Sequence, residues 1–238
     1  MDASVASGGA GAPGHEAPTR ESPGHGALSP ALLAWLADQP LAACRVLDVG
    51  TGTGRLALAL APRVRRVVGI DIDAGALVEA RRRARRAGLG NVLFVVADAE
   101  RADYRTLGHP DVVVAHLCMS DAIVGRAAAG LEPGGLLAFA AFHVDQWRET
   151  GRVSRFAYDE VQARAVLAAA GFDVEALEVE REVMRFESIE EALAYAGRFR
   201  GKWEADGRWA GWQRFLATGG RTLTESRLVV RARREPAP

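Results

Sequence analysis

The chain has 238 residues, 49% of them hydrophobic, and its 30 basic and 30 acidic side chains leave no net formal charge. This length suits one α/β domain with a full core. The lack of a basic excess argues against a nucleic-acid partner, and no apolar run reaches the roughly 20 residues that span a bilayer. The two cysteines, Cys44 and Cys118, have no metal-ligand spacing and form no disulfide framework, so a reducing, cytoplasmic compartment is expected.

The chain divides by composition into a tail and a domain. Residues 1–29 are rich in Gly, Ala, Pro and Ser. Such a segment buries too little apolar surface to order itself, so a disordered tail is expected there. Residues 30–238 are expected to form the domain, which Pro30 opens with an amphipathic helix.

Strands and helices alternate after that helix. Asp73 is expected to cap the N-terminus of one helix, and Gly88 follows its end. Alternating helices and apolar strands predict a Rossmann-like, mostly parallel sheet with helices on both faces. The seven expected strands cover residues 44–49, 65–72, 91–98, 111–117, 136–143, 173–183 and 222–233.

Residues 186–220 form an insert between the last two expected strands. Ser188 and Glu191 have the spacing of a capping box, so a helix is expected to begin there. The insert also carries five large aromatic residues, Phe199, Trp203, Trp209, Trp212 and Phe215. They favour either a lid over an acceptor pocket or an aromatic mini-core that holds the insert together. Its basic residues, Arg198, Arg200, Lys202, Arg208 and Arg214, either meet an acidic ligand or are solvated.

The stretch "VLDVGTGTGRLAL" (46–58) is a strand followed by a glycine-rich turn. Glycine lets the backbone approach a ligand without a Cβ in the way. The dinucleotide fingerprint G-x-G-x-x-G needs a glycine at position 55, which is Arg55, whereas the third glycine here is Gly54. Asp48 would repel a pyrophosphate and attract a cationic amino group. The turn therefore favours a ligand with an amino-acid end over a dinucleotide.

Four segments, in this order, resemble the motifs of the class I S-adenosylmethionine-dependent methyltransferases. They are "VLDVGTGTG", "VVGIDID", "VVADAE" and "LEPGGLLAFA". With the final strand, the resemblance extends over residues 30–180 and 222–233. It implies S-adenosyl-L-methionine as the cofactor and a seven-stranded sheet whose last strand is antiparallel.

The resemblance also implies roles for individual residues. Asp71 would accept hydrogen bonds from both ribose hydroxyls, Asp98 would accept from the adenine amine, and the N–H of Ala99 would meet the adenine ring. Strand-end capping or turn formation is the alternative for the acids. The other residues expected at the cofactor are Asp48, Gly50, Thr51, Gly52, Gly54, Ile72 and His116.

Two histidines are candidates for proton transfer to or from the methyl acceptor. His116 ends the fourth expected strand and His143 ends the fifth, where the resemblance places the acceptor. The pKa of histidine suits a base near neutral pH. The alternatives are that His116 matters only through its carbonyl and that neither side chain reacts. Methyl transfer from a sulfonium needs no nucleophile from the protein, and no metal is expected.

The favoured function is methyl transfer to a small molecule, with nucleic acid an unlikely partner and no membrane association. Methylation of a protein or RNA is the first alternative. A regulator that binds the cofactor without turnover is the second, because a fold alone establishes no reaction. The sequence leaves the acceptor and the oligomeric state open.

Overall fold

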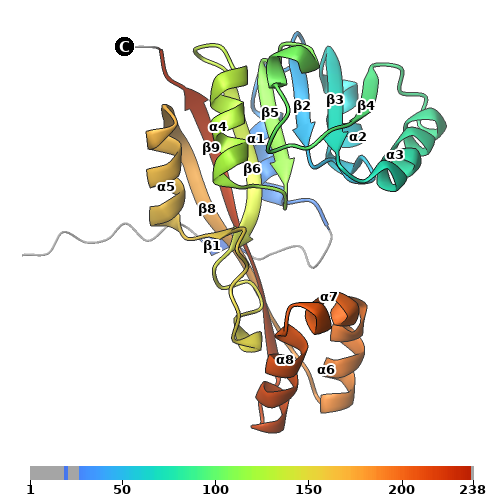
Figure 1. The fold of residues 1–238 in the computed structure, drawn as a ribbon, viewed down its shortest axis with the longest axis vertical. Coiled ribbons are helices and arrows are strands. Elements are labelled where there is room, and N and C mark those ends of the chain that lie inside the picture. Colours follow the sequence, from blue (N-terminus) through green and yellow to red (C-terminus); the bar gives the residue numbers. More distant parts are fainter. Residues whose placement is uncertain (1–18, 21–26, 237–238) are drawn as a thin grey trace, which may run out of the picture.

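The computed structural model describes residues 19–20 and 27–236. One mixed sheet runs through the molecule in the order β1-β8-β9-β6-β5-β2-β3-β4, with β7 paired to β6 (Figure 1). The strands are β1 (Thr19–Arg20), β2 (Arg45–Val49), β3 (Arg66–Asp71), β4 (Val92–Val96), β5 (Val112–His116), β6 (Leu136–His143), β7 (Ala157–Tyr158), β8 (Phe172–Arg185) and β9 (Thr222–Arg234).

The prediction of a Rossmann-like fold is confirmed. All seven expected strands form, from β2 to β6 with β8 and β9, and β9 is antiparallel to both of its neighbours. The short strands β1 and β7 were not expected. The strand order reverses between β2 and β5, and in open α/β sheets ligands bind beyond the carboxyl ends of the strands at such a point.

Helices cover both faces of the sheet because each presents a stripe of small and aliphatic side chains. One core lies between the sheet and α4 and α5, and the other lies between the sheet and α1, α2 and α3. The helices are α1 (Pro30–Ala37), α2 (Arg55–Leu60), α3 (Ala74–Arg86), α4 (Asp121–Gly130), α5 (Glu160–Ala169), α6 (Ile189–Ala196), α7 (Arg200–Ala205) and α8 (Arg208–Ala217). Among the described residues, no helix combines the length and apolar character needed to cross a bilayer.

Local signals in the sequence account for several helix ends. Asp73 caps α3 by accepting hydrogen bonds from the N–H groups of Gly75 and Ala76, and Gly88 follows the helix with a φ of +67°. Ser188 caps α6 by accepting from the N–H of Glu191. These three expectations are confirmed, because a cap depends only on neighbouring residues.

The expected disordered tail falls almost entirely outside the described residues. At its boundary the structure differs from the prediction, since Ser29 is fully buried and caps α1. Its hydroxyl donates to Glu180 of β8 at 2.8 Å, so a residue assigned to the tail belongs to the folded domain.

The insert lies beyond the carboxyl ends of the parallel strands, on a long hairpin made by β8 and β9 (Figure 1). The hairpin continues past the end of the β6 pairing to Arg185 and Thr222. Helices α6, α7 and α8 pack there around a third core, which also contains Trp147 from the loop after β6. The insert therefore packs against a loop that leaves the carboxyl edge of the sheet.

Candidate functional site

The three glycines of the turn after β2 all have a left-handed φ, +65° at Gly50, +53° at Gly52 and +80° at Gly54. A Cβ on Gly50 would lie 2.3 Å from Cys118 Sγ, and one on Gly54 would lie 2.9 Å from Phe94 Cζ. A Cβ on Gly52 would meet no atom within 4 Å. Gly50 and Gly54 are therefore required by packing as well as by backbone shape, and Gly52 faces open space.

Asp48 lies beneath this turn, with its side chain 1% exposed. Its Oδ2 accepts hydrogen bonds from Thr51 Oγ1 at 2.5 Å and from the N–H of Ala57 at 3.0 Å. Burial raises the pKa of Asp48 to about 7. These contacts fit the turn-forming alternative, and they direct both Asp48 and the Thr51 hydroxyl into the protein.

Asp71, at the end of β3, holds the turn from the neighbouring strand. Its Oδ2 accepts from the N–H of Gly52 at 2.8 Å, and its Oδ1 accepts from the N–H of Asp73 at 2.9 Å. A carboxylate oxygen has more than one acceptor site, so these bonds leave capacity for hydroxyl donors. The carboxylate is thus placed at the rim of the turn.

A pocket of about 390 Å³ opens beside Asp71 at the carboxyl ends of the strands. This volume lies in the range typical of small-molecule sites. Of the expected cofactor residues, the pocket brings together Gly50, Asp71, Ile72, Asp98 and Ala99. Asp98 Oδ1 accepts from the N–H of Glu100, and Ile72 is 73% exposed. An exposed apolar side chain beside a strand-end carboxylate suits a ligand with a flat ring and a ribose.

The rest of the pocket lining was not predicted. It is mostly apolar and includes Leu117, Cys118, Met119, Ser120 and Ile123, together with Arg155 and Phe156. Leu117 has a φ of +60°, unusual for a branched side chain, and such strain concentrates at functional sites. The run "AHLCMSD" contained the signal, but periodicity does not distinguish a pocket wall from a core.

His116 does not line either of the two pockets at this edge. Its Nε2 accepts a hydrogen bond from the N–H of Ser29 at 3.2 Å. Desolvation, together with the charges of Arg227 and Arg55, lowers the pKa of His116 to about 3. A base with so low a pKa accepts a proton poorly at neutral pH, so this environment disfavours the proton-transfer role.

His143 is 4% exposed and is held by its neighbours. Its Nε2 lies 3.3 Å from Glu160 Oε2, and its Nδ1 accepts from the N–H of Asp145 at 3.2 Å. It lines neither pocket. Both ring nitrogens are therefore engaged, which fits a structural role better than catalysis.

A second pocket, of about 350 Å³, lies between the insert and the loop after β6. It shares Arg155 and Phe156 with the pocket beside Asp71, so the two are neighbours. Trp147, in its wall, has a φ of +56°. The other residues that line it are Phe142, Gln146, Arg152, Val153, Ser154, Lys202, Asp206 and Arg208.

The aromatic residues of the insert form the mini-core that was one of the two interpretations. Trp203 and Trp212 are fully buried, and Phe199 is 8% exposed. Trp203 packs against Trp147 with ring centroids 5.1 Å apart. None of the tryptophans of the insert lines the second pocket, so the insert contributes polar side chains to it. The lid itself stays a prediction, but the tryptophans belong to the mini-core and not to the wall of this pocket.

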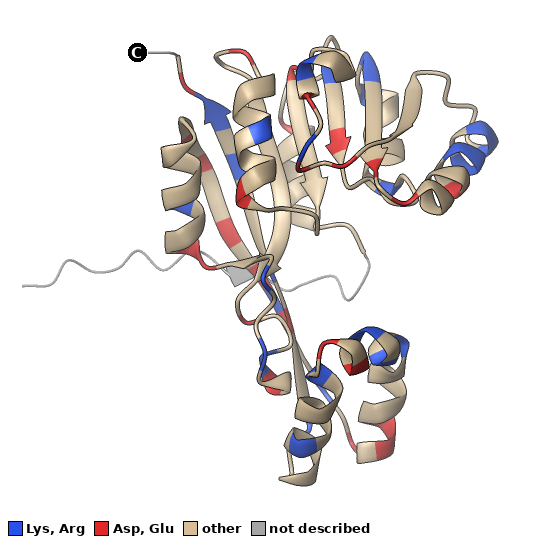
Figure 2. Ribbon diagram, viewed as in Figure 1, with Lys and Arg blue, Asp and Glu red and all other residues tan. Residues whose placement is uncertain are grey.

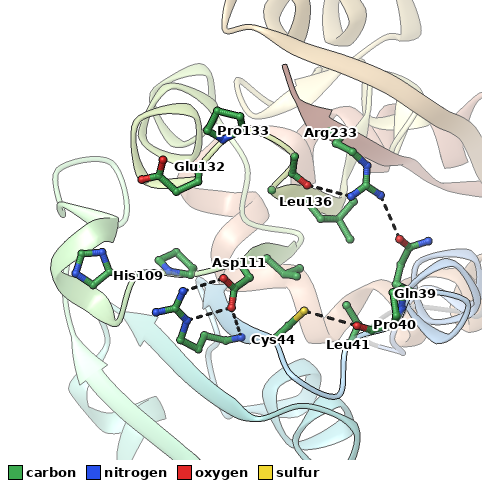
Figure 3. Close-up of a pocket in the computed structure, with 16 residues that line it drawn as sticks. Gln39, Pro40, Leu41, Cys44, His109, Asp111, Glu132, Pro133, Leu136 and Arg233 are labelled. Atoms are coloured by element: carbon green, nitrogen blue, oxygen red, sulfur yellow. Dashed lines mark hydrogen bonds and ion pairs between the residues drawn. The ribbon is translucent and has the colours of Figure 1, made fainter. Parts of the chain in front are cut away.

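A pocket of about 440 Å³ lies at the opposite edge, at the amino ends of β2, β5 and β6 (Figure 3). Three of its charged side chains, Arg45, Asp111 and Arg233, are already bound to other side chains. Arg45 binds Asp111 through two nitrogens, at 3.0 and 2.8 Å, and Arg233 donates to Gln39 at 3.2 Å. Ligands of open α/β sheets bind at the other edge, so we assign this pocket no function.

Comparison with protein families agrees with this geometry. Residues 46–135 match the family model described as "Methyltransferase domain". This segment contains the glycine turn, Asp71 and Asp98. The chain therefore contains a methyltransferase domain over these residues, and its fold is consistent with the class I S-adenosylmethionine-dependent methyltransferases, with S-adenosylmethionine as cofactor. The prediction of the family is confirmed.

Two curated relatives show how local the sequence similarity is. A 23S rRNA (uracil(1939)-C(5))-methyltransferase of Stenotrophomonas maltophilia is 52% identical over 54 residues, 23% of this chain and 12% of that protein. A ribosomal protein L11 methyltransferase of Pseudomonas paraeruginosa is 38% identical over 123 residues, 49% of this chain and 40% of that protein. The chain thus matches well under half the length of these relatives.

Solved structures extend the likeness over most of the chain. YcgJ of Bacillus subtilis superimposes with a TM-score of 0.66 at 17% identity, covering 87% of this chain and 99% of that one. The [4+2]-cyclase SpnF gives 0.62 at 23% identity, covering 94% and 88%. A Haemonchus contortus phosphoethanolamine N-methyltransferase, solved with S-adenosyl-L-methionine, gives 0.56 at 20% identity, covering 86% and 52%. Identities this low establish the fold alone.

Proposed function

We propose that this chain transfers the methyl group of S-adenosylmethionine to a small-molecule acceptor. The observation that supports it most strongly is the pocket beside Asp71, which gathers Gly50, Ile72, Asp98 and Ala99 from the ends of three separate strands. The cofactor would supply an activated methyl group on its sulfonium. Asp71 would hold the ribose hydroxyls, and Asp98 and Ala99 would orient the adenine.

The protein's contribution to the reaction is then placement. The pocket beside Asp71 would fix the cofactor, and the second pocket would hold the acceptor in line with it. We assign no general base, because His116 has a low pKa and both ring nitrogens of His143 are engaged. An acceptor atom that is already nucleophilic without losing a proton, such as a neutral amine nitrogen, needs none for the transfer, and the product can release its proton to water.

The size of the second pocket favours a small acceptor over a macromolecule. Its volume of about 350 Å³ is bounded by the insert and by the loop after β6. A methyltransferase that acts on RNA or protein is the second candidate, because two relatives are named for rRNA and a ribosomal protein. A [4+2]-cyclase has a similar fold, so the third candidate is a protein that uses this fold without transferring a methyl group. The cytoplasmic location stays a prediction.

Asp71→Ala tests the cofactor site. Loss of two charge-assisted hydrogen bonds, each worth about 1.5–3 kcal/mol, should weaken S-adenosylmethionine binding at least tenfold in calorimetry. Asp73→Ala removes an equal charge two residues away, and should cost α3 about 1 kcal/mol with cofactor affinity unchanged. Equal affinities in the two variants would contradict the assignment of Asp71.

Turnover of methyl-labelled cofactor against a metabolite extract tests the acceptor class. We expect label in the low-mass fraction, and we expect it to persist after the extract is treated with nuclease and protease. Label that disappears with either treatment would identify a macromolecular acceptor. Binding of the cofactor without any labelled product would support a protein that binds the cofactor but transfers no methyl group.

A further inference from the structure

The second pocket is lined by four basic side chains and one acidic side chain. Arg152 and Arg155 come from the loop after β6, and Lys202 and Arg208 come from the insert. Figure 2 shows basic segments on both of these parts, beyond the carboxyl ends of the strands. The whole chain has no net charge, so the excess of positive charge in the pocket is local and does not reflect the overall composition.

Arg208 is the buried member of this group, at 8% exposed. Its Nη1 binds Asp206 Oδ2 at 2.5 Å, and its guanidinium lies 5.7 Å from the Trp147 ring. Its Nε has no hydrogen-bond acceptor among the residues the structure describes. A buried cationic donor without an acceptor is costly, so the residues around Arg208 do not satisfy all of its donors.

Arg152 is brought close to Arg208 by a backbone feature. Gly207 has a φ of +81°, and a Cβ there would lie 2.5 Å from Arg152 Nη1. The missing side chain therefore lets the Arg152 guanidinium lie over the residue that precedes Arg208. Within the described part of the chain, no carboxylate forms an ion pair with Arg152, Arg155 or Lys202. Like charges held together in this way favour an anionic ligand.

The rest of the pocket wall is largely apolar, with Phe142, Trp147 and Phe156 among its residues. Aromatic side chains bind flat apolar groups with little loss of conformational freedom. Phe156 and Arg155 also line the pocket beside Asp71, so a ligand here would lie next to the cofactor. The pocket thus combines an anion-binding end with an apolar wall.

We infer that the methyl acceptor is a small apolar or aromatic molecule with a carboxylate or phosphate group. The anionic group is held by Arg208, Lys202 and Arg152, and the apolar part lies against Phe142 and Trp147. This inference rests on the proposed function for the statement that the ligand is the acceptor. The preference for an anion rests on the second pocket alone.

Probe binding tests the inference in the full chain saturated with S-adenosylhomocysteine. The probes are benzoate, phenyl phosphate and the neutral benzamide, titrated in a calorimeter. We expect benzoate or phenyl phosphate to bind at least about tenfold more tightly than benzamide. The tighter of the two anions tells a carboxylate acceptor from a phosphate acceptor. Benzamide binding as tightly as both anions, or no measurable binding of either anion, overturns the inference.

Matched variants locate the probe. Arg208→Gln should weaken binding of the anionic probe at least about tenfold, and Lys202→Gln about threefold or more. Arg200→Gln, on the same helix as Lys202, is the control, because Arg200 is exposed, pairs with Glu204 and does not line the pocket. Since Lys202 is also exposed, its variant tests the pocket even if Arg208→Gln folds poorly. Unchanged anion binding in Lys202→Gln and in folded Arg208→Gln overturns the inference.

Titration of S-adenosylhomocysteine alone separates this inference from the proposed function. A chain that does not bind S-adenosylhomocysteine refutes the proposed cofactor site. In that event the same probes, titrated without the cofactor product, still report whether the second pocket prefers anions. Normal S-adenosylhomocysteine binding with no preference for anions refutes only the inference.

Discussion

The three glycines of the turn after β2 differ in what their missing side chains allow. Gly50 and Gly54 are packed against Cys118 and Phe94, and substitution there would disturb the fold. Gly52 has the same left-handed backbone but faces open space beside Asp71. At the residue scale, a side chain added at Gly52 would therefore block a ligand without disturbing the packing of the protein.

Gly52→Val should abolish cofactor binding, because its branched side chain would enter the space in front of the turn. Gly88→Val is the matched control, since Gly88 has a φ of +67°, has open space around it and lies at the far end of α3. Both variants should lose about 1–2 kcal/mol of stability from backbone strain. Calorimetry with S-adenosylmethionine and thermal melting measure the two effects. Retained binding in folded Gly52→Val would show that the turn does not face the ligand.

His116 gives a pH-dependent contribution to stability with a definite sign. Its pKa is about 3 in the folded chain and 6.5 in the unfolded one, so the unfolded chain binds the proton more readily. The contribution is present above pH 6.5 and is lost as the pH falls towards 3. The melting temperature of the wild type relative to His116→Gln should therefore decline over this range. A constant difference between the two melting temperatures would contradict the low pKa.

At the scale of elements, the insert depends on its own aromatic core. Trp212→Ala should cost about 3–5 kcal/mol, because the indole is fully buried. Gln213→Ala, exposed on the same helix, should change stability by less than about 0.5 kcal/mol. Affinity for S-adenosylhomocysteine should stay within about threefold in both, since Trp212 does not line the pocket beside Asp71. Wild-type stability of Trp212→Ala in chemical denaturation would refute the mini-core.

At the scale of the whole molecule, the two edges of the sheet offer different pockets, and only the carboxyl edge is assigned the cofactor. Saturation with S-adenosylhomocysteine at 100 times its Kd should stabilise the chain by about 2.7 kcal/mol. Hydrogen exchange should show protection at residues 50–54, 71–73, 97–100 and 117–120. Protection confined to Arg45, Asp111 and Arg233 would instead move the site to the opposite edge.

Much of the fold and part of the site could be predicted because local chemistry determines them. The seven long strands are apolar or alternating runs, and the caps at Asp73 and Ser188 need only residues two or three positions away. The spacing of the glycines and the acids at the strand ends predicted a methyltransferase domain, which the family model matches over residues 46–135. Parallel strands bring their carboxyl ends to one edge, so Asp71 and Asp98 had to lie near each other.

Contacts between distant residues decided the rest. His116 is the acceptor for Ser29, 87 positions away, so a candidate base is partly buried and engaged in a contact with another segment. The Trp147 ring from the loop after β6 completes the core of the insert, so the tryptophans face inward and Lys202 and Arg208 line the pocket. A sequence records which residues are apolar or charged. Only packing decides which of them face a core and which face a ligand, because that depends on surfaces contributed by other segments.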